Sequence, residues 1–87
     1  MNTYDVTKDR LLFLLEEKKL SIHALAIKSG VAPSTIKNIL YGKSRNPKLI
    51  TIKMICDGLG ITLGEFFATP EFDELEQELK WTNSGGL

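Results

Sequence analysis

The segment covering residues 22–41, IHALAIKSGVAPSTIKNILY, most constrains what this chain can fold into. Apolar residues recur at helical spacing on both sides of a glycine, with Ala26 before it and Ile36 and Ile39 after it. Gly30 stands where the first helix has to end, in the left-handed conformation that glycine adopts without steric cost. The small side chain of Ala26 allows two helices to cross closely. The spacing therefore predicts two short helices joined by a tight turn, a helix-turn-helix.

Charge is segregated along the chain, although the formal net charge is zero. Residues 28–53 contain no acidic residue and six basic ones: Lys28, Lys37, Lys43, Arg45, Lys48 and Lys53. Residues 54–87 contain one basic residue and seven acidic ones. Because the positive block coincides with the predicted motif, it is typical of a nucleic-acid-binding surface. The second helix of such a motif commonly lies in the DNA major groove.

The length and composition are those of one small globular domain, since 87 residues can bury only a modest core. The single cysteine, Cys56, excludes an internal disulfide bond and is typical of a reducing compartment. The longest apolar run, from Leu11 to Leu15, is too short to span a membrane, and the N-terminus lacks the apolar segment of a signal peptide. We therefore expect a cytoplasmic protein with no membrane association.

Apolar periodicity without any strand pattern predicts an all-α fold. Helices are expected at about residues 7–19, 22–29, 33–41 and 49–59, and a fifth after Thr62. Ser21 is a suitable N-cap for the second of these helices. Thr62 and Glu65 have the spacing of a capping box, in which each side chain bonds to the other residue's backbone.

A sixth, acidic helical segment is predicted over residues 71–81, where Phe72, Leu75 and Leu79 recur at helical spacing. The last residues, TNSGGL, are expected to be disordered. The expected organisation is a helical domain at residues 1–69, an acidic extension at 70–81 and a disordered tail at 82–87.

Several positions, read in register, resemble the Cro/CI-type helix-turn-helix proteins, also called the XRE family. The positions that carry the resemblance lie within about residues 6–68 and are Leu25-Ala26, Gly30-Val31, Thr35-Ile36, Ile39, Gly42, Pro47, Ile55, Leu59-Gly60 and Phe66-Phe67. The resemblance implies a compact five-helix domain like that of lambda repressor. It also implies a bacterial or phage transcriptional regulator, in particular a repressor, that binds double-stranded DNA without catalysing a reaction.

The resemblance makes the segment from Pro33 to Tyr41 the recognition helix. At 3.6 residues per turn, the buried side of this helix is formed by Ile36, Ile39 and Leu40. An asparagine amide can pair with adenine, a lysine can donate to guanine or phosphate, and a serine can contact either. The predicted base contacts are therefore Asn38, Lys37 and Ser34.

Phosphate contacts are expected from the basic loop after this helix and from polar side chains near it. The predicted phosphate-contacting residues are Lys43, Arg45, Lys48, Asn46, Tyr41 and Ser21. Backbone N–H groups at the starts of the second and fourth helices can also bind phosphate. Such contacts position a protein on DNA without reading its sequence.

The chain departs from the family pattern at several positions. Ile22 stands where the family often has a phosphate-binding Gln, Pro33 stands where it often has a polar base reader, and Ala32 is a poor N-cap. Leu15 and Leu40 occupy the positions of a buried Arg–Glu pair. Replacement of such a pair by apolar residues is often neutral or stabilising, so the fold is expected to be retained.

The apolar residues outside the motif leave two interpretations open. Leu12 and Phe13 make the first helix apolar nearly all round, and the acidic segment could cover them within one chain. Alternatively the same residues could form a homodimer contact, through Leu12, Phe13, Phe72, Leu75 and Leu79. A third possibility is that the acidic residues interact with the basic face and weaken non-specific DNA binding.

A different class of function also fits these features, namely a protein-interaction module such as an antitoxin or adaptor. Trp81 either packs on its own chain or anchors a partner. An enzyme is not expected, because paired carboxylates, a nucleophile with its base and a phosphate-binding loop are absent from the sequence. His23 has no metal-ligand partners at suitable spacing and Cys56 fits a core position, so no metal or cofactor is expected.

Overall fold

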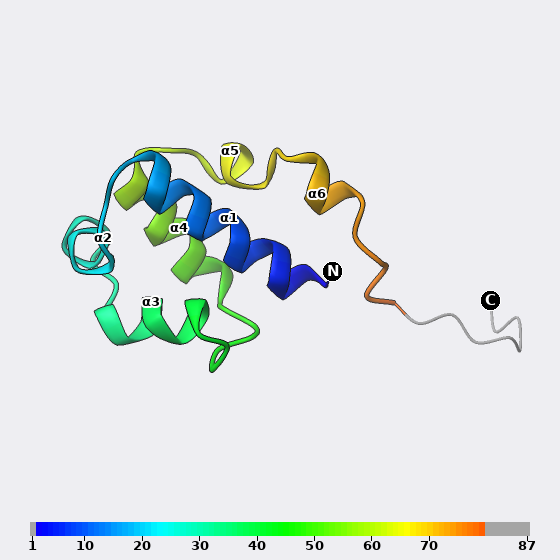
Figure 1. Cartoon of the computed structure of the whole chain (residues 1–87), viewed down its shortest axis with the longest axis horizontal. Helices are drawn as coiled ribbons and strands as arrows, with labels where there is room; N and C mark the ends of the chain where they lie inside the picture. The colour runs from blue at the N-terminus through cyan, green and yellow to red at the C-terminus, as the bar shows by residue number, and fades with distance from the viewer. Residues whose placement is uncertain (1, 80–87) are drawn as a thin grey trace, which may run out of the picture.

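The computed structural model describes residues 2–79, and this part of the chain consists entirely of helices and loops. Its helices are α1 (Thr3–Glu17), α2 (Ile22–Ser29), α3 (Pro33–Leu40), α4 (Leu49–Leu59), α5 (Leu63–Phe67) and α6 (Pro70–Asp73). Helix α3 lies along one side of the molecule, and α5 and α6 lie along the opposite side (Figure 1). The predicted all-α class, with five helices and a short acidic helix, is confirmed.

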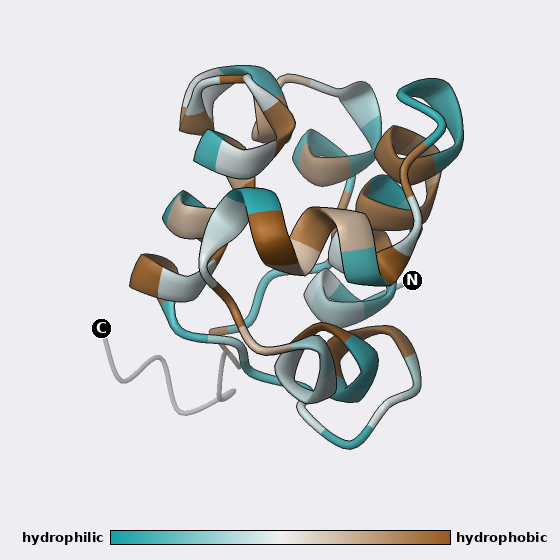
Figure 2. Ribbon diagram, turned by 90° about the vertical axis from the view of Figure 1, so that its left-hand side faces the viewer, coloured by the Kyte–Doolittle hydropathy of each residue, from teal (hydrophilic) through white to brown (hydrophobic). Residues whose placement is uncertain are grey.

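The core lies between these helices, where one apolar side of each helix meets the next. Helix α2 packs mainly on α4, α3 packs on α2 and α1, α5 packs on α4, and α6 packs on α1. Hydrophobic and hydrophilic residues alternate along the helices, as amphipathic packing requires (Figure 2). The fully buried side chains are Phe66, Leu11, Leu25, Ile36, Ile39, Ile55 and Cys56. Among residues 2–79 no helix is long and apolar enough to cross a membrane.

The helix-turn-helix forms as its sequence predicts. The Ser21 hydroxyl accepts a hydrogen bond from the Ala24 backbone N–H at 3.0 Å and so caps α2. Gly30 ends α2 with a φ of 73°, and its N–H donates to the carbonyl of Ala26 at 2.9 Å. Pro33 is the first residue of α3, where its missing N–H costs no intrahelical bond. The turn therefore fixes the direction in which α3 leaves α2.

Helix α1 begins at Thr3, four residues before its predicted start at residue 7. The reason is local, because the Asn2 side chain accepts from the Asp5 backbone N–H at 2.8 Å and supplies an N-cap. Helices α2 and α4 have the predicted bounds, and α3 ends at Leu40, one residue short of its prediction. The Thr62–Glu65 capping box is present at the start of α5.

The acidic helix is shorter than predicted, since α6 ends at Asp73 and residues 74–79 are not helical. Acidic side chains follow one another through this segment without a basic residue to pair with them, and negative charge at a helix C-terminus opposes the helix dipole. A helix of one turn also lacks the length to be stable alone. Position 81 and the predicted disordered tail at 82–87 lie outside the described residues.

Phe72 attaches α6 to the core and does not cover Leu12 and Phe13 of α1. Its ring lies 4.9 Å from that of Phe67 and 6.3 Å from that of Phe66, measured between ring centroids. Leu12 and Phe13 stay 44% and 52% exposed, so residues 70–79 do not cover these two side chains as predicted.

Helix α4 approaches α2 closely at Gly58. A Cβ atom added to this glycine would lie 2.7 Å from the Cβ of Ser29 and 2.9 Å from its Cα and N atoms. Separations under 3.0 Å to backbone atoms require the two helices to move apart. Gly58 is therefore needed for the α2–α4 packing and not for any special backbone conformation.

We predict that Gly58→Ala lowers the free energy of unfolding by about 1–3 kcal/mol, the usual cost of overpacking a core contact. The measurement is urea denaturation followed by circular dichroism. Gly64→Ala in α5 is the matched control, because a Cβ there would lie an ordinary 3.7 Å from the Thr62 hydroxyl oxygen. Equal effects of the two substitutions would contradict the role given to Gly58.

Candidate nucleic-acid interface

Helix α3 presents one buried and one exposed face. The buried face is formed by Ile36, Ile39 and Leu40, as predicted. Ser34, Lys37 and Asn38, the three predicted base readers, are all exposed. Within residues 2–79 their side chains make no hydrogen bond or ion pair, so their polar groups are available to a ligand.

The loop between α3 and α4 carries most of the predicted phosphate contacts on its surface. Its exposed members are Tyr41, Lys43, Arg45, Asn46 and Lys48. The backbone N–H of Ser44 donates to the carbonyl of Asn38 at 2.9 Å, and this bond folds the loop back against the end of α3. The loop that carries the basic side chains thus lies beside the C-terminal end of α3.

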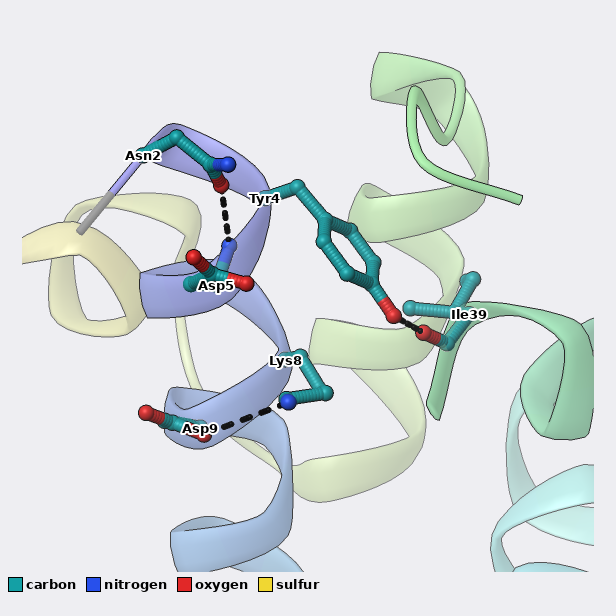
Figure 3. Close-up of polar contacts among 6 residues, drawn as sticks. All are labelled: Asn2, Tyr4, Asp5, Lys8, Asp9 and Ile39. Carbon is teal, nitrogen blue, oxygen red and sulfur yellow. Dashed lines mark hydrogen bonds and ion pairs between the residues drawn. The ribbon is translucent and has the colours of Figure 1, made fainter. Parts of the chain in front are cut away.

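Tyr4 in α1 joins this loop to α3, a contact that sequence reasoning missed. Its hydroxyl donates to the backbone carbonyl of Ile39 at 2.6 Å, so its ring reaches from α1 to the end of α3 (Figure 3). The Arg45 guanidinium carbon lies 4.6 Å from the centroid of the same ring. The only local signal for such a role is an aromatic residue in a stretch that was expected to precede the first helix.

The positive block keeps most of its charge unpaired. Lys53 forms an ion pair with Asp57 one turn further along α4. Among the described residues, the other five basic side chains of the block have no acidic partner: Lys28, Lys37, Lys43, Arg45 and Lys48. The surface around α3 and its loop is therefore electropositive, which favours a polyanion.

Helix N-termini add donors to this surface. Lys48 is the N-cap residue of α4, and no side chain within residues 2–79 caps that helix. Its first-turn N–H groups are therefore available for an anion beside the basic loop. Ser21, the remaining predicted phosphate contact, is exposed at the start of α2, where its hydroxyl oxygen already accepts the capping bond and its hydrogen can still be donated.

The acidic segment reaches the edge of the basic surface at one point. Glu78 accepts a hydrogen bond from the Thr3 hydroxyl and lines the same groove, of about 700 Å³, as Arg45 and Asn46. No ion pair joins it to Arg45 within the described residues. The predicted interaction between the acidic residues and the basic face is thus limited to this neighbourhood.

The other candidate chemical groups lie apart from such a site. His23 is exposed on α2, and residues 2–79 contain no cluster of three side chains that could hold a metal ion. Cys56 is fully buried in α4, and burial, aided by the negative charge of Asp57, raises the pKa of its thiol. A raised pKa keeps the thiol protonated and unreactive at neutral pH.

We predict that native Cys56 reacts with a thiol-specific chromogenic disulfide roughly tenfold or more slowly at neutral pH than it does in concentrated urea. The reason is that the reagent needs a thiolate that is accessible to solvent. The measurement is the absorbance of the released thiol with time. Equal rates in the two conditions would contradict the buried, protonated state of this side chain.

These features define a helix-turn-helix domain with an exposed, electropositive second helix, and comparison with known proteins gives its family. Residues 10–71 match the family described as the Cro/C1-type HTH DNA-binding domain. The chain therefore belongs to the Cro/C1-type helix-turn-helix family of DNA-binding proteins. This confirms the resemblance read from the sequence.

A solved structure is similar to this chain over most of its length. It is described as the crystal structure of the prophage Lp1 protein 11, with a TM-score of 0.73 and 30% sequence identity. The match covers 86% of this chain and 100% of that one. The comparison with curated proteins gave no match.

Proposed function

We propose that this protein is a sequence-specific transcriptional repressor that reads the major groove with α3. The observation that carries the proposal is a combination of two features within residues 2–79: exposed polar side chains on α3 without intramolecular partners, and exposed basic side chains without acidic partners in the adjacent loop. Binding to an operator would exclude polymerase or a competing regulator, and no catalytic step is needed. Such a protein acts where the DNA is, in the cytoplasm.

In this proposal the exposed residues of α3 contact base edges. Asn38 makes a bidentate contact to adenine, Lys37 donates to guanine or to a nearby phosphate, and Ser34 contacts the first bases that the helix meets. The side chains of Ile22 and Pro33 are apolar and cannot form hydrogen bonds to DNA. Asn38, Lys37 and Ser34 are therefore the residues proposed to contact the bases. Because these side chains make no hydrogen bond within residues 2–79, no hydrogen bond of that part of the chain has to break when they bind.

Phosphate contacts hold the domain in register on the duplex. The proposed residues are Lys43, Arg45, Lys48, Asn46, Tyr41 and Ser21, together with the N–H groups at the start of α4. Each neutralised phosphate contributes about −0.9 to the slope of log affinity against log salt concentration. If all five basic residues of the positive block that have no acidic partner within residues 2–79 each neutralise one phosphate, the slope is about −4 to −5.

We further propose that two copies bind together through α1. Leu12 and Phe13 are exposed large apolar side chains on that helix, and Phe13 lines a groove of about 360 Å³ with Val6 and Pro70. Leu79 is 66% exposed and could contact a second copy, whereas Leu75 is partly buried and has less surface for such a contact. Phe72 packs on Phe66 and Phe67 within the chain and so contributes less than was expected.

The same apolar surface favours a second candidate, an antitoxin or adaptor whose main partner is another protein. In that case Leu12 and Phe13 would contact the partner instead of a second copy. A toxin-like reading frame beside the gene would favour this alternative. The two functions are compatible, because a DNA-binding antitoxin can also regulate its own promoter.

The function is tested by selecting duplexes from a random library on the purified protein and sequencing them. We expect a short motif, and for a dimer two inverted half-sites about 34 Å apart along the duplex. A single half-site would indicate binding by monomers. Recovery of unenriched sequence would contradict sequence-specific recognition.

We predict that Asn38→Ala relaxes specificity at one base position of the selected motif. Loss of a bidentate contact costs about 1–3 kcal/mol for the preferred base and little for the others. The measurement is fluorescence anisotropy on the motif and on its single-base variants. Lys18→Ala, on the surface at the end of α1, is the control substitution and should leave the specificity unchanged. An unchanged affinity ratio between motif and random duplex would show that Asn38 reads no base.

A further inference from the structure

We propose that Tyr4 is a positioning residue for DNA binding, which holds the end of α3 and the Arg45 guanidinium in the orientation that meets the duplex. The inference rests on the proposed function and deepens it by naming how the basic loop is ordered. Tyr4 lies on α1 and is only 9% exposed, so it acts through Arg45 and α3 and does not itself touch DNA.

The first observation concerns the end of α3. The last four carbonyls of a helix have no intrahelical partner and need another donor. The carbonyls of Lys37 and Asn38 receive backbone N–H groups of the following loop. The next carbonyl, that of Ile39, receives the Tyr4 hydroxyl at 2.6 Å (Figure 3). A side chain from α1 thus satisfies one of the C-terminal carbonyls of the recognition helix.

The second observation concerns Arg45. Its guanidinium stacks over the Tyr4 ring at 4.6 Å, a cation–π distance. Within residues 2–79 it has no hydrogen bond or ion pair, so its N–H groups are available for phosphate oxygens. An arginine in an exposed loop loses rotamer freedom when it binds, and the ring removes part of that freedom in advance.

The third observation concerns the loop between these two contacts. Gly42 has a φ of 86°, and a Cβ atom added to it would lie 3.7 Å from the Tyr4 hydroxyl oxygen. The loop therefore turns directly over the tyrosine. Three separate parts of the proposed interface, namely the last turn of α3, the turn at Gly42 and the Arg45 side chain, all meet this one side chain.

The test is a double-mutant cycle on duplex affinity, measured by anisotropy with the full chain and a random duplex at low salt. Tyr4→Leu removes the aromatic ring. We expect this substitution to weaken duplex binding about 2- to 5-fold more in the wild-type background than in the Arg45→Ala background. This factor corresponds to the free energy of one cation–π contact. Lys43→Ala is the matched control background, because within residues 2–79 Lys43 makes no hydrogen bond or cation–π contact with Tyr4. There the effect of Tyr4→Leu should equal its effect in the wild type.

A general loss of structure would weaken binding equally in all three backgrounds, and that result would overturn the inference. Arg45→Lys, in an exposed loop, gives a second route that does not disturb the core: it keeps the charge but loses the planar stacking. We expect it to weaken binding by a similar factor, and wild-type affinity in this variant would also overturn the inference.

A readout without DNA separates this inference from the proposed function. The Nε–H proton of Arg45 should show an upfield ring-current shift in the NMR spectrum, retained in Tyr4→Phe and lost in Tyr4→Leu. If the wild-type chain binds duplex DNA but the cycle shows no coupling, only the role of Tyr4 fails. If the wild-type chain shows the ring-current shift but binds no duplex, the proposed function fails and the inference fails with it.

Discussion

The close contact between α2 and α4 is the interaction on which the rest of the structure depends. Gly58 allows α4 to approach the backbone of Ser29, so α2 is held against α4, the helix on which it packs most extensively. Helix α3 has no comparable contact with α4, and its position follows from α2 through the turn at Gly30. The geometry of the proposed DNA-binding surface therefore originates in a contact that lies away from that surface.

Helix α1 supports α3 from its other end. Leu15 and Leu40, at positions where the family often has a charged pair, are both buried in the core. Tyr4 lies at the N-terminal end of α1, and its hydroxyl donates to the Ile39 carbonyl near the C-terminal end of α3. With the turn from α2 at one end and α1 at the other, α3 has a fixed direction before any ligand binds. Such preorganisation reduces the entropy lost on binding.

Local signals in the sequence predicted the features that depend on neighbouring residues. The Ser21 cap, the turn at Gly30 and the Thr62–Glu65 capping box each involve residues within a few positions of one another. The early start of α1 was missed because it depends on one capping bond from Asn2. The role of Gly58 could not be predicted from neighbouring residues, since the need for glycine inside α4 becomes clear only from the position of α2 in the structure.

The candidate site divides in the same way. Helical periodicity alone predicts which residues of α3 face outward. The distribution of charge along the sequence predicts the basic loop after α3. The link through Tyr4 could not be predicted, because its partners are 35 and 41 positions away in the chain. The end of the acidic helix at Asp73 differs from the prediction, because repulsion between like charges in this segment opposes the longer helix that the hydrophobic spacing favours.

The most direct test of the central claim is the affinity of the wild-type chain for the DNA upstream of its own gene, compared with random duplex at two salt concentrations. The account predicts tighter binding to the upstream DNA, together with a salt slope of about −4 to −5. Weak binding without preference, or binding that does not respond to salt, would contradict it. That result would direct attention to the apolar surface of α1 and to a protein partner.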